Sequence, residues 1–536
     1  MDASTIQRRR WVILGVVVVG LLAIVIDNTV LNVALKTIAS PAGRGGLGAS
    51  QSELEWAINS YTLVFAGLLF TFGIVGDRIG RKRVLMAGLI LFGLGSLFSA
   101  YSHSPDQLIA ARAVMGLGGA AVMPQTLSII ANVFEPAERP RAIGIWTSAV
   151  GIGVAIGPVL GGLLLTHFWW GSVFLINVPV TVAGAVASLF LIPESRNPAP
   201  GKIDYLGVAG SIVGLVLLVY GIVQGGDGES WGSLGVLGPA LGGLVVLALF
   251  AWHESRIEHP SLDVRLFKNR TLSASVGSIA LLFFGMGGVY FFSSFYLQNV
   301  RGYSPLETGL LAVPFALGQF VMSPRSASLV NRYGARAVGV AGMLMNAVAI
   351  GGWAFLTAAS PIWIVAVMFF VQGAGLGLAI PAATSSIMDA LPRERAGAGS
   401  ALTNTARQVA VALSVAVLGS ILSQAYRHSL DPTLSALPAA ARSAAGSSIT
   451  ATQAVAAQLG QAGQFLLAPA DSAFVDAMRI TTAVAAALAV IGGLAVLRWM
   501  PGRNRPNIEE LVAAEVAAAE RDLEAGLRER PELSER

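Results

Sequence analysis

The stretch "GDRIGRKRVL", residues 76–85, places five ionisable side chains among ten residues. The segments on either side of it, 58–75 and 84–101, contain no charged residue. Helices of that length, rising 1.5 Å per residue, cross most of the ~30 Å hydrocarbon core of a bilayer. The pattern therefore predicts a short charged loop between two membrane-spanning helices.

The rest of the chain repeats this alternation of apolar runs and short polar gaps. Only 12% of its 536 residues are charged and 54% are hydrophobic, and the mean hydropathy is +0.68. Soluble domains carry about 25% charged residues. We therefore expect an all-α polytopic membrane protein. The chain has no cysteine, which excludes disulfides and Cys-ligated metals.

Fourteen apolar segments are long enough to be spans, so both termini should lie on one side. The short loops on that side hold sixteen Lys and Arg residues, and the short loops opposite hold three. The positive-inside rule makes the basic side cytoplasmic, which predicts a multi-pass protein of the cytoplasmic membrane with both termini inside. It also explains the net charge of +5 without a nucleic-acid partner. The predicted spans are 11–35, 56–75, 84–101, 108–133, 142–166, 170–192, 203–223, 233–252, 272–297, 306–330, 337–358, 361–388, 399–424 and 478–500.

Two motifs recur at nearly the same spacing. "DRIGRK" (77–82) returns as "NRYGAR" (331–336), and "GLGGAAVMP" (116–124) returns as "GAGLGLAIP" (373–381), with offsets of 331 − 77 = 254 and 373 − 116 = 257. Transporters are often built from such repeats. The predicted organisation is a six-helix bundle at 1–200, two inserted spans and a cytoplasmic loop at 201–270, a second six-helix bundle at 271–500 with an extracellular loop at 425–477, and a cytoplasmic tail at 501–536.

Two six-helix halves in parallel orientation are the pattern of the major facilitator superfamily. "GIVGDRIGRKRVL" (73–85) resembles its signature loop, and "RAVMGLGGA" (112–120) resembles its Arg-bearing fourth-span motif. "GIGVAIGPVLGGLL" (151–164) resembles the fifth-span motif of drug antiporters, and "DNTVLNVAL" (27–35) resembles the first-span motif of the 14-span drug:proton antiporters. Further similarities are "FLINVPV" (174–180) and "LTNTARQ" (402–408).

The resemblance implies a major facilitator fold of fourteen transmembrane helices. It also implies a proton-coupled antiporter that exports small hydrophobic or amphipathic compounds such as drugs, antibiotics or secondary metabolites by alternating access. Two alternatives use the same fold, a proton-coupled metabolite symporter and a lipid transporter. The expected partners are a small-molecule substrate, protons and the lipid bilayer, and the expected state is a monomer.

The resemblance gives the opening stretch a role as a cytoplasmic latch. Asp77 and Arg81 would bond to the other half, and to Glu135 at the end of the fourth span, when the cytoplasmic side is shut. Such a contact must form in one conformation and break in another. Membrane topology alone would explain the basic residues, but not the acid and the glycines beside them. The predicted gate residues are Gly76, Asp77, Arg78, Gly80, Arg81, Lys82 and Glu135.

Asp27 and Arg112 are charged residues within predicted spans, where each costs about 2.5–3.5 kcal/mol. Asp27 lies in the outer half of the first span and Arg112 about one turn into the fourth, so the two can pair. One interpretation is a static ion pair that fixes packing. The other is proton coupling, in which Asp27 binds the proton or a cationic substrate and Arg112 tunes its proton affinity. We expect the coupling role.

Glycines in the fifth span permit a close helix approach, and its proline permits a kink. The resemblance associates this motif with export by antiport. The predicted hinge residues are Gly153, Gly157, Pro158, Gly161 and Gly162. Polar and aromatic residues within the spans are candidates for the wall of a substrate cavity. These are Asn28, Asn59, Tyr61, Gln125, Tyr290, Gln298, Asn404, Arg407 and Gln408.

The sequence offers little support for an enzyme. "GESWG" (228–232) matches a hydrolase elbow, but it lies in a short loop between two spans and lacks the strand-to-helix context. No phosphate-binding loop for ATP occurs, and the five histidines lie at or outside span ends. We therefore expect no catalytic activity, no metal and no cofactor, with the proton gradient as the source of energy.

Overall fold

The computed structural model describes residues 3–135, 138–196, 204–257, 260, 262–391 and 396–502. All regular elements in these ranges are helical, and they form fourteen candidate spans by length and composition. The predicted tail lies outside the described residues, apart from Pro501 and Gly502.

The first half contains six candidate spans, the last of which is broken into α6 and α7. Local sequence explains several boundaries. Ser50 and Glu53 form a capping box at the start of α2, and Ser104 caps α4, which has a proline in its first turn. The helices are α1 (Ala3–Ala39), α2 (Gln51–Ile79), α3 (Arg81–Ala100), α4 (Pro105–Val133), α5 (Arg139–His167), α6 (Ser172–Leu175) and α7 (Asn177–Leu191).

The second half also contains six candidate spans. Its second span is broken between α11 and α12, where Pro314 occupies the first turn of α12. The helices are α10 (Arg270–Phe295, continued by a π-helical turn at Tyr296–Val300), α11 (Pro305–Leu311), α12 (Val313–Tyr333), α13 (Ala335–Gly352), α14 (Ile362–Asp389), α15 (Ala396–Leu434), α16 (Ala439–Ala445), α17 (Ile449–Gln458) and α18 (Leu467–Trp499).

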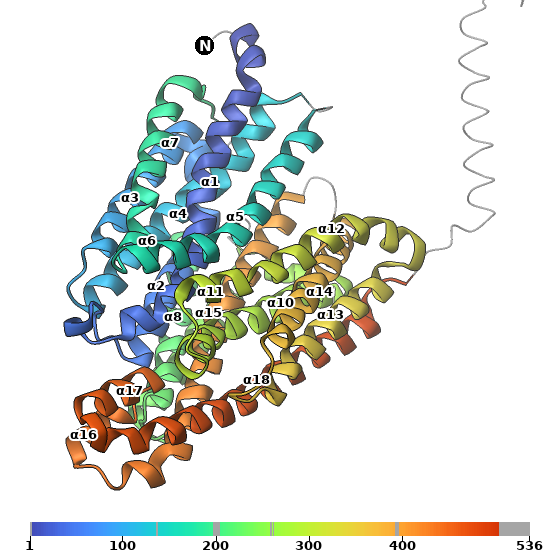
Figure 1. Ribbon diagram of the computed structural model, residues 1–536. Helices are drawn as coiled ribbons and strands as arrows, with labels where there is room; N and C mark the ends of the chain where they lie inside the picture. Colours follow the sequence, from blue (N-terminus) through green and yellow to red (C-terminus); the bar gives the residue numbers. More distant parts are fainter. Residues whose placement is uncertain are drawn as a thin grey trace, which may run out of the picture.

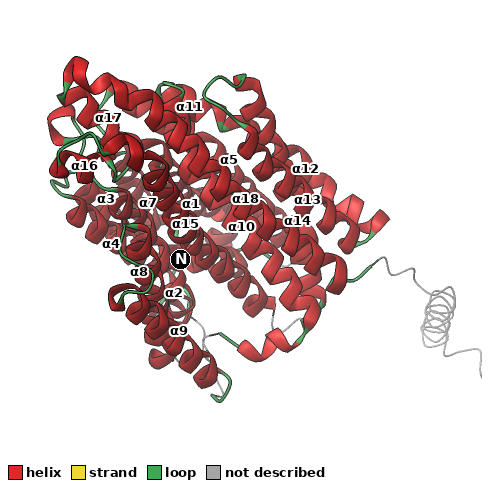
Figure 2. Ribbon diagram, turned by 90° about the horizontal axis from the view of Figure 1, so that it is seen from below, coloured by secondary structure: helices red, strands yellow, loops and turns green. Residues whose placement is uncertain are grey.

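Two further helices, α8 (Tyr205–Gly226) and α9 (Leu234–Glu254), form the inserted pair. They pack against each other, and α8 also packs against α2 of the first half and α15 of the second. Figure 2 shows α8 and α9 at the edge of the molecule beside α2. The inserted pair therefore bridges the two halves from one side.

Most of residues 425–477, which the sequence analysis treats as a loop, are helical. α15 continues to Leu434, and α18 begins at Leu467 rather than near 478. Between them, α16 and α17 form a small cap that is joined to α10 by a hydrogen bond of 2.9 Å from Asn299 Nδ2 to Thr450 Oγ1. We refer to this end of the molecule as the capped end, and to the opposite end, which holds the N-terminus, as the basic end (Figure 1).

The internal repeat is visible in the closest helix crossings. A Cβ added to Gly116 of α4 would lie 2.5 Å from Tyr61 O of α2, and one added to Gly373 of α14 would lie 1.9 Å from Phe315 O of α12. The partners keep the two sequence offsets, since 315 − 61 = 254 and 373 − 116 = 257. The recurring glycines therefore mark equivalent helix crossings that leave no room for a side chain.

The two halves touch near the capped end. Lys36 Nζ donates a hydrogen bond to Gln298 O, and Gln298 Nε2 donates to Val33 O at 2.9 Å. Figure 1 shows the helices of the first half standing upright and those of the second half sloping away from them toward the basic end. The structure is therefore closed at the capped end.

Candidate functional site

Asp27 and Arg112 form an ion pair inside the first half. Arg112 Nη1 donates a hydrogen bond to Asp27 Oδ2, and each residue is only 1% exposed. Arg112 Nε also donates to Ala57 O of α2 at 3.1 Å. The pair therefore joins α1, α2 and α4, and its predicted geometry is present in the structure.

The second carboxylate oxygen of Asp27 has its own partner. Asn177 Nδ2 donates to Asp27 Oδ1 at 3.0 Å and lies 3.1 Å from Ser96 Oγ, which in turn donates to Phe174 O at 2.8 Å. Neither Asn177 nor Ser96 was among the predicted site residues. Asn177 lies within "FLINVPV", where a carboxamide in an apolar span was the available signal.

Aromatic rings enclose the guanidinium of Arg112. Its Cζ lies 4.4 Å from the ring centroid of Tyr61 and 5.8 Å from that of Phe174. The Tyr61 hydroxyl accepts a hydrogen bond of 3.2 Å from Asn28. Such contacts stabilise a desolvated cation. The site holds the negative charge of Asp27 away from water and compensates it with Arg112. A proton that binds Asp27 would remove this negative charge and leave the Arg112 cation uncompensated.

The glycines of α5 lie along α1, close to this site. A Cβ on Gly157 would lie 1.8 Å from Thr29 Oγ1, one on Gly153 would lie 2.8 Å from Val25 Cγ1, and one on Gly161 would lie 3.2 Å from Val30 Cγ1. Thr29 is two residues after Asp27 in the same helix. The α5 glycines therefore allow α1 and α5 to pack closely beside the ion pair.

The same stretch of α5 also meets the second half. A Cβ on Gly162 would lie 2.5 Å from Pro305 O, and a Cβ on Gly309 of α11 would lie 2.2 Å from Pro158 O. The hinge residues therefore lie between α1 on one side and α11 on the other. Helix α1 also contacts α11, but α5 packs against it more extensively.

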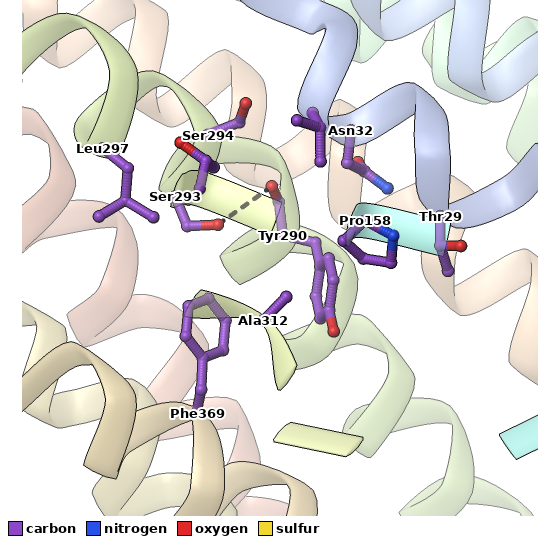
Figure 3. A pocket seen from close by; sticks show the side chains of 11 residues that line it. Thr29, Asn32, Pro158, Tyr290, Ser293, Ser294, Leu297, Ala312 and Phe369 are labelled. Carbon is purple, nitrogen blue, oxygen red and sulfur yellow. Dashed lines mark hydrogen bonds between the residues drawn. The ribbon is translucent and has the colours of Figure 1, made fainter. Parts of the chain in front are cut away.

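A small cavity of about 20 Å³, large enough for about one water molecule, lies between the halves. Figure 3 shows Thr29, Asn32 and Pro158 facing Tyr290 and Phe369 across it. The rings of Tyr290 and Phe369 have centroids 6.0 Å apart. The complete lining is Thr29, Asn32, Val33, Pro158, Tyr290, Ser293, Ser294, Leu297, Thr308, Ala312 and Phe369.

Among the predicted cavity residues, Tyr290 lines this space and the other eight do not. Asn59, Tyr61, Gln125 and Gln298 are at most 1% exposed, because they fill contacts between helices. Gln125 Nε2, for example, donates to Phe72 O at 2.7 Å. Asn28, Asn404, Arg407 and Gln408 are partly exposed, and the Arg407 guanidinium lies 5.2 Å from the ring centroid of Phe283. Their role in transport stays a prediction.

Residues 76–83 were predicted to form a loop, but α2 continues to Ile79 and α3 begins at Arg81, so only Gly80 lies between the helices. The segment bonds within the first half. Arg81 reaches Asp77 Oδ1 at 2.8 Å and Ser128 O at 3.3 Å. Arg81 N donates to Ser195 O at 3.0 Å, and Lys82 N donates to Glu194 Oε1 at 3.2 Å. Arg81 and Lys82 thus have no described partner in the second half, and their role as a latch stays a prediction.

Glu135, the partner expected when the cytoplasmic side is shut, is exposed, and its role stays a prediction. The acid that contacts this segment is Glu194, which follows α7 in the chain. Gly80 has φ +123°, and a Cβ there would lie 2.5 Å from Glu194 Oε1. A Cβ on Gly76 would lie 2.0 Å from Gln125 Oε1, so a side chain at position 76 would have to displace Gln125. Arg78 is exposed at the end of α2.

With this geometry in place, comparison with known proteins is informative. The family profile of the Major Facilitator Superfamily matches residues 17–415. The chain is 35% identical, over 91% of its length and 96% of the relative's, to the multidrug efflux pump LfrA of Mycolicibacterium smegmatis. It is 34% identical, over 78% and 77% of the two lengths, to the tetracenomycin C resistance and export protein of Streptomyces glaucescens.

A third relative is the methyl viologen resistance protein SmvA of Salmonella typhimurium, 33% identical over 92% of this chain and 98% of the relative. Among solved structures, a bacterial homologue of the human lysosomal transporter Spinster, in an inward-facing and unoccupied conformation, is similar with a TM-score of 0.61. Its identity is 18%, and the match covers 91% of this chain and 98% of that one. This likeness concerns the fold alone.

Proposed function

The chain belongs to the Major Facilitator Superfamily, and on that premise we propose that it exports small hydrophobic or amphipathic compounds in exchange for protons. The named activities of its relatives, drug efflux and antibiotic resistance, support export. The observation that carries the proposal is the buried Asp27–Arg112 pair. A single proton bound to the buried Asp27 carboxylate would neutralise it and leave the Arg112 cation unpaired beside it.

Proton binding at Asp27 must be accompanied by a rearrangement of Arg112. Breaking a buried pair leaves one charge uncompensated, which costs about 3–5 kcal/mol. Arg112 also holds Ala57 O and lies over Tyr61, so its movement acts on α2 as well as on α1. The charge state of one carboxyl is thereby linked to the relative positions of three helices.

A continuous line of contacts leads from Asp27 to the other half. Asp27 and Thr29 share α1, Thr29 packs on Gly157, and the neighbouring Pro158 packs on Gly309 of α11. A shift of α1 therefore reaches α11 without an intervening flexible segment. This is the route by which we propose that protonation biases the rocking of the halves.

The charges of the loops indicate which end of the protein faces each side of the membrane. We propose that the basic end faces the cytoplasm and that the capped end faces outward, which makes this conformation inward-facing. One proton moving through a membrane potential of about 150 mV supplies roughly 3.5 kcal/mol, enough for a substrate gradient of a few hundred fold. The proposal requires no catalysis, no cofactor other than the proton gradient and no second copy of the chain.

The test is ethidium efflux against its concentration gradient from energised cells, measured for the parent and for Asp27→Asn. The matched control is Asp106→Asn, which removes an exposed acid from the first turn of α4. We expect a protonophore to stop efflux in the parent, Asp27→Asn to abolish it, and Asp106→Asn to keep it. Efflux that continues in Asp27→Asn and still collapses with the protonophore would refute Asp27 as the coupling residue. Protonophore-resistant efflux would refute proton exchange itself.

A further inference from the structure

We infer that Glu55 is a second proton-binding site, filled from the capped end, and that its protonation allows the capped end to close. The inference rests on the proposed proton-coupled transport and adds a second carboxyl to it. It follows from the burial, the missing partner and the position of this one side chain.

Glu55 is completely enclosed in the structure. It lies in the second turn of α2 and is 2% exposed. A Cβ added to Gly419 of α15 would lie 2.3 Å from Glu55 Oε1 and 2.6 Å from its Cδ. The carboxyl group therefore rests directly on the backbone of a helix from the other half, with no space for water between them.

Among the described residues, the Gln51 side chain and Arg427 favour a charge on Glu55, but burial outweighs them and Asp227 also opposes the charge. Its Oε2 has no hydrogen-bond partner. The charged groups that face it are Asp227, which follows α8, and Arg427 of α15, and these pair with each other at 3.0 Å. On its own helix, Glu53 is engaged with Ser50 in the capping box. An unpaired buried carboxylate is far more costly than the neutral acid, so this conformation favours the protonated form.

Glu55 occupies the junction of all three parts of the protein. Below it, Leu63 of α2, Val219 of α8 and Ala412 of α15 belong to one apolar cluster. Above it, Ser52 Oγ donates to Asp227 Oδ2 at 3.1 Å, and Asp227 accepts from Arg427, so this polar layer covers the carboxyl. Opening the capped end has to separate α2 from α15, and this separation admits water to Glu55.

The consequence is a linkage between proton binding and closure. When the capped end opens, hydrated Glu55 releases its proton to the water on that side. When the end closes, Glu55 must first take one proton back from the same water, since the closed site disfavours the anion. Asp27 differs from it, because the Asp27–Arg112 pair lies within the first half and remains compensated in the closed state.

The test uses the natural absence of cysteine. Ser293→Cys introduces a thiol at a residue that is 5% exposed and lines the small cavity between the halves (Figure 3). A membrane-impermeant thiosulfonate reagent is added outside intact cells at pH 6 and pH 8, without substrate. All variants carry Asp27→Asn, which removes the acid of the buried ion pair in the first half. Ala436→Cys, at an exposed position of the capped end, corrects for the intrinsic effect of pH on the thiol.

After that correction, we expect labelling of Ser293→Cys to be about fivefold or more faster at pH 8 than at pH 6. Glu55→Gln matches the shape of the protonated acid and should label slowly at both pH values. The control Glu53→Gln keeps an acceptor for the capping box and should retain the pH ratio. A pH ratio that survives in Glu55→Gln, or that is lost equally in Glu53→Gln, overturns the inference.

A second variant tests the same site by steric displacement of the Glu55 carboxyl group rather than by removal of its charge. Gly419→Ala places a methyl group where the Glu55 carboxyl lies, so we expect fast labelling at both pH values. Labelling as slow as that of the parent at pH 6 would contradict the inference. The labelling assay requires no transport. A Glu55-dependent pH ratio, when the parent chain with Asp27 shows no dye efflux, therefore refutes only the proposed export. Dye efflux by the parent chain without this pH ratio refutes only the Glu55 site.

Discussion

The two halves of the protein have the same helix crossings but contain different side chains at corresponding positions. In the first half, Arg112 lies over Tyr61. The same offsets of 369 − 112 = 257 and 315 − 61 = 254 lead to Phe369 and Phe315 in the second half. There the centroids of the Phe315 and Phe369 rings lie 5.5 Å and 6.0 Å from that of Tyr290. A buried cation thus corresponds to an aromatic cluster.

The comparison separates what the fold needs from what transport needs. Both halves keep glycines where helices cross, since the backbones would otherwise collide. The buried Asp27–Arg112 pair lies in the first half, next to the α5 residues that contact the second half. The aromatic cluster borders the small cavity between the halves. We therefore assign proton coupling to the first half, and expect the second half to select substrates by apolar contact.

Exchanging the distinctive side chain in each half should give the largest effects and the clearest contrast. Arg112→Met leaves Asp27 buried without its cation. We expect this variant to lose about 3–5 kcal/mol of stability and to lose export. Phe369→Leu should cost about 1–2 kcal/mol and alter the range of exported compounds while keeping protonophore sensitivity. Thermal unfolding in detergent and efflux of several dyes provide the measurements. Loss of proton coupling in Phe369→Leu would contradict the assignment of coupling to the first half and of substrate selection to the second.

The shared helix crossings predict equal sensitivity in the two halves. Gly116→Ala and Gly373→Ala each press a methyl group onto a backbone oxygen. The added Cβ would lie 2.5 Å from Tyr61 O in the first case and 1.9 Å from Phe315 O in the second. We expect each to lower stability by about 1–3 kcal/mol. Gly144→Ala in α5 meets no atom within 4 Å and should be neutral or stabilising by about 0.5–1 kcal/mol. The yield and melting temperature of the purified variants test this. If Gly373→Ala left stability unchanged, the two helix crossings would not be structurally equivalent.

The loops that follow the second span of each half offer a finer contrast. Gly80 has φ +123° and Gly334 has φ +86°, so alanine at either position should cost about 1–3 kcal/mol. Only Gly80→Ala should also slow export, because it displaces Glu194 from Lys82 N. Initial efflux rates at matched expression compare the two variants. Equal slowing in both would mean that the latch is shared by the halves.

The inserted pair belongs to neither half and provides the smallest expected effect. Partial burial raises the pKa of Asp204, but hydrogen bonds from Gly207 N–H and His253 outweigh this and lower the pKa below its ordinary value. The resulting stability is present above pH 4 and decreases as the pH falls through the lowered pKa. Asp204→Asn should cost less than about 1 kcal/mol near pH 7, since the pair is partly exposed. Melting temperatures between pH 3 and 7 should converge for parent and variant at the acidic end.

Much of the fold could be predicted from the sequence. Apolar runs predicted fourteen spans, and the two ordered motif matches predicted the repeat that the Gly116 and Gly373 crossings display. The superfamily assignment is confirmed by the match over residues 17–415. The pairing of Asp27 with Arg112 followed from their similar depth, because a buried charge requires a partner.

Side-chain partners were harder to predict. Glu55 was missed because the second span was predicted to begin at residue 56, whereas the capping box starts the helix at Gln51. Glu194 was not recognised as the acid beside Gly80, because their contact depends on how α7 packs beside α3. The predicted cavity residues could not be sorted, since the apolar spans lack the amphipathic pattern that would orient a helix.

Coupling is tested most directly with purified protein in liposomes that carry an imposed pH gradient. The parent should accumulate ethidium against its concentration gradient. Asp27→Asn should bring ethidium only to equal concentrations on both sides, because the carrier can still rock but cannot exchange a proton. Accumulation by Asp27→Asn equal to that of the parent would contradict the account, since the buried ion pair would then have no part in energy coupling.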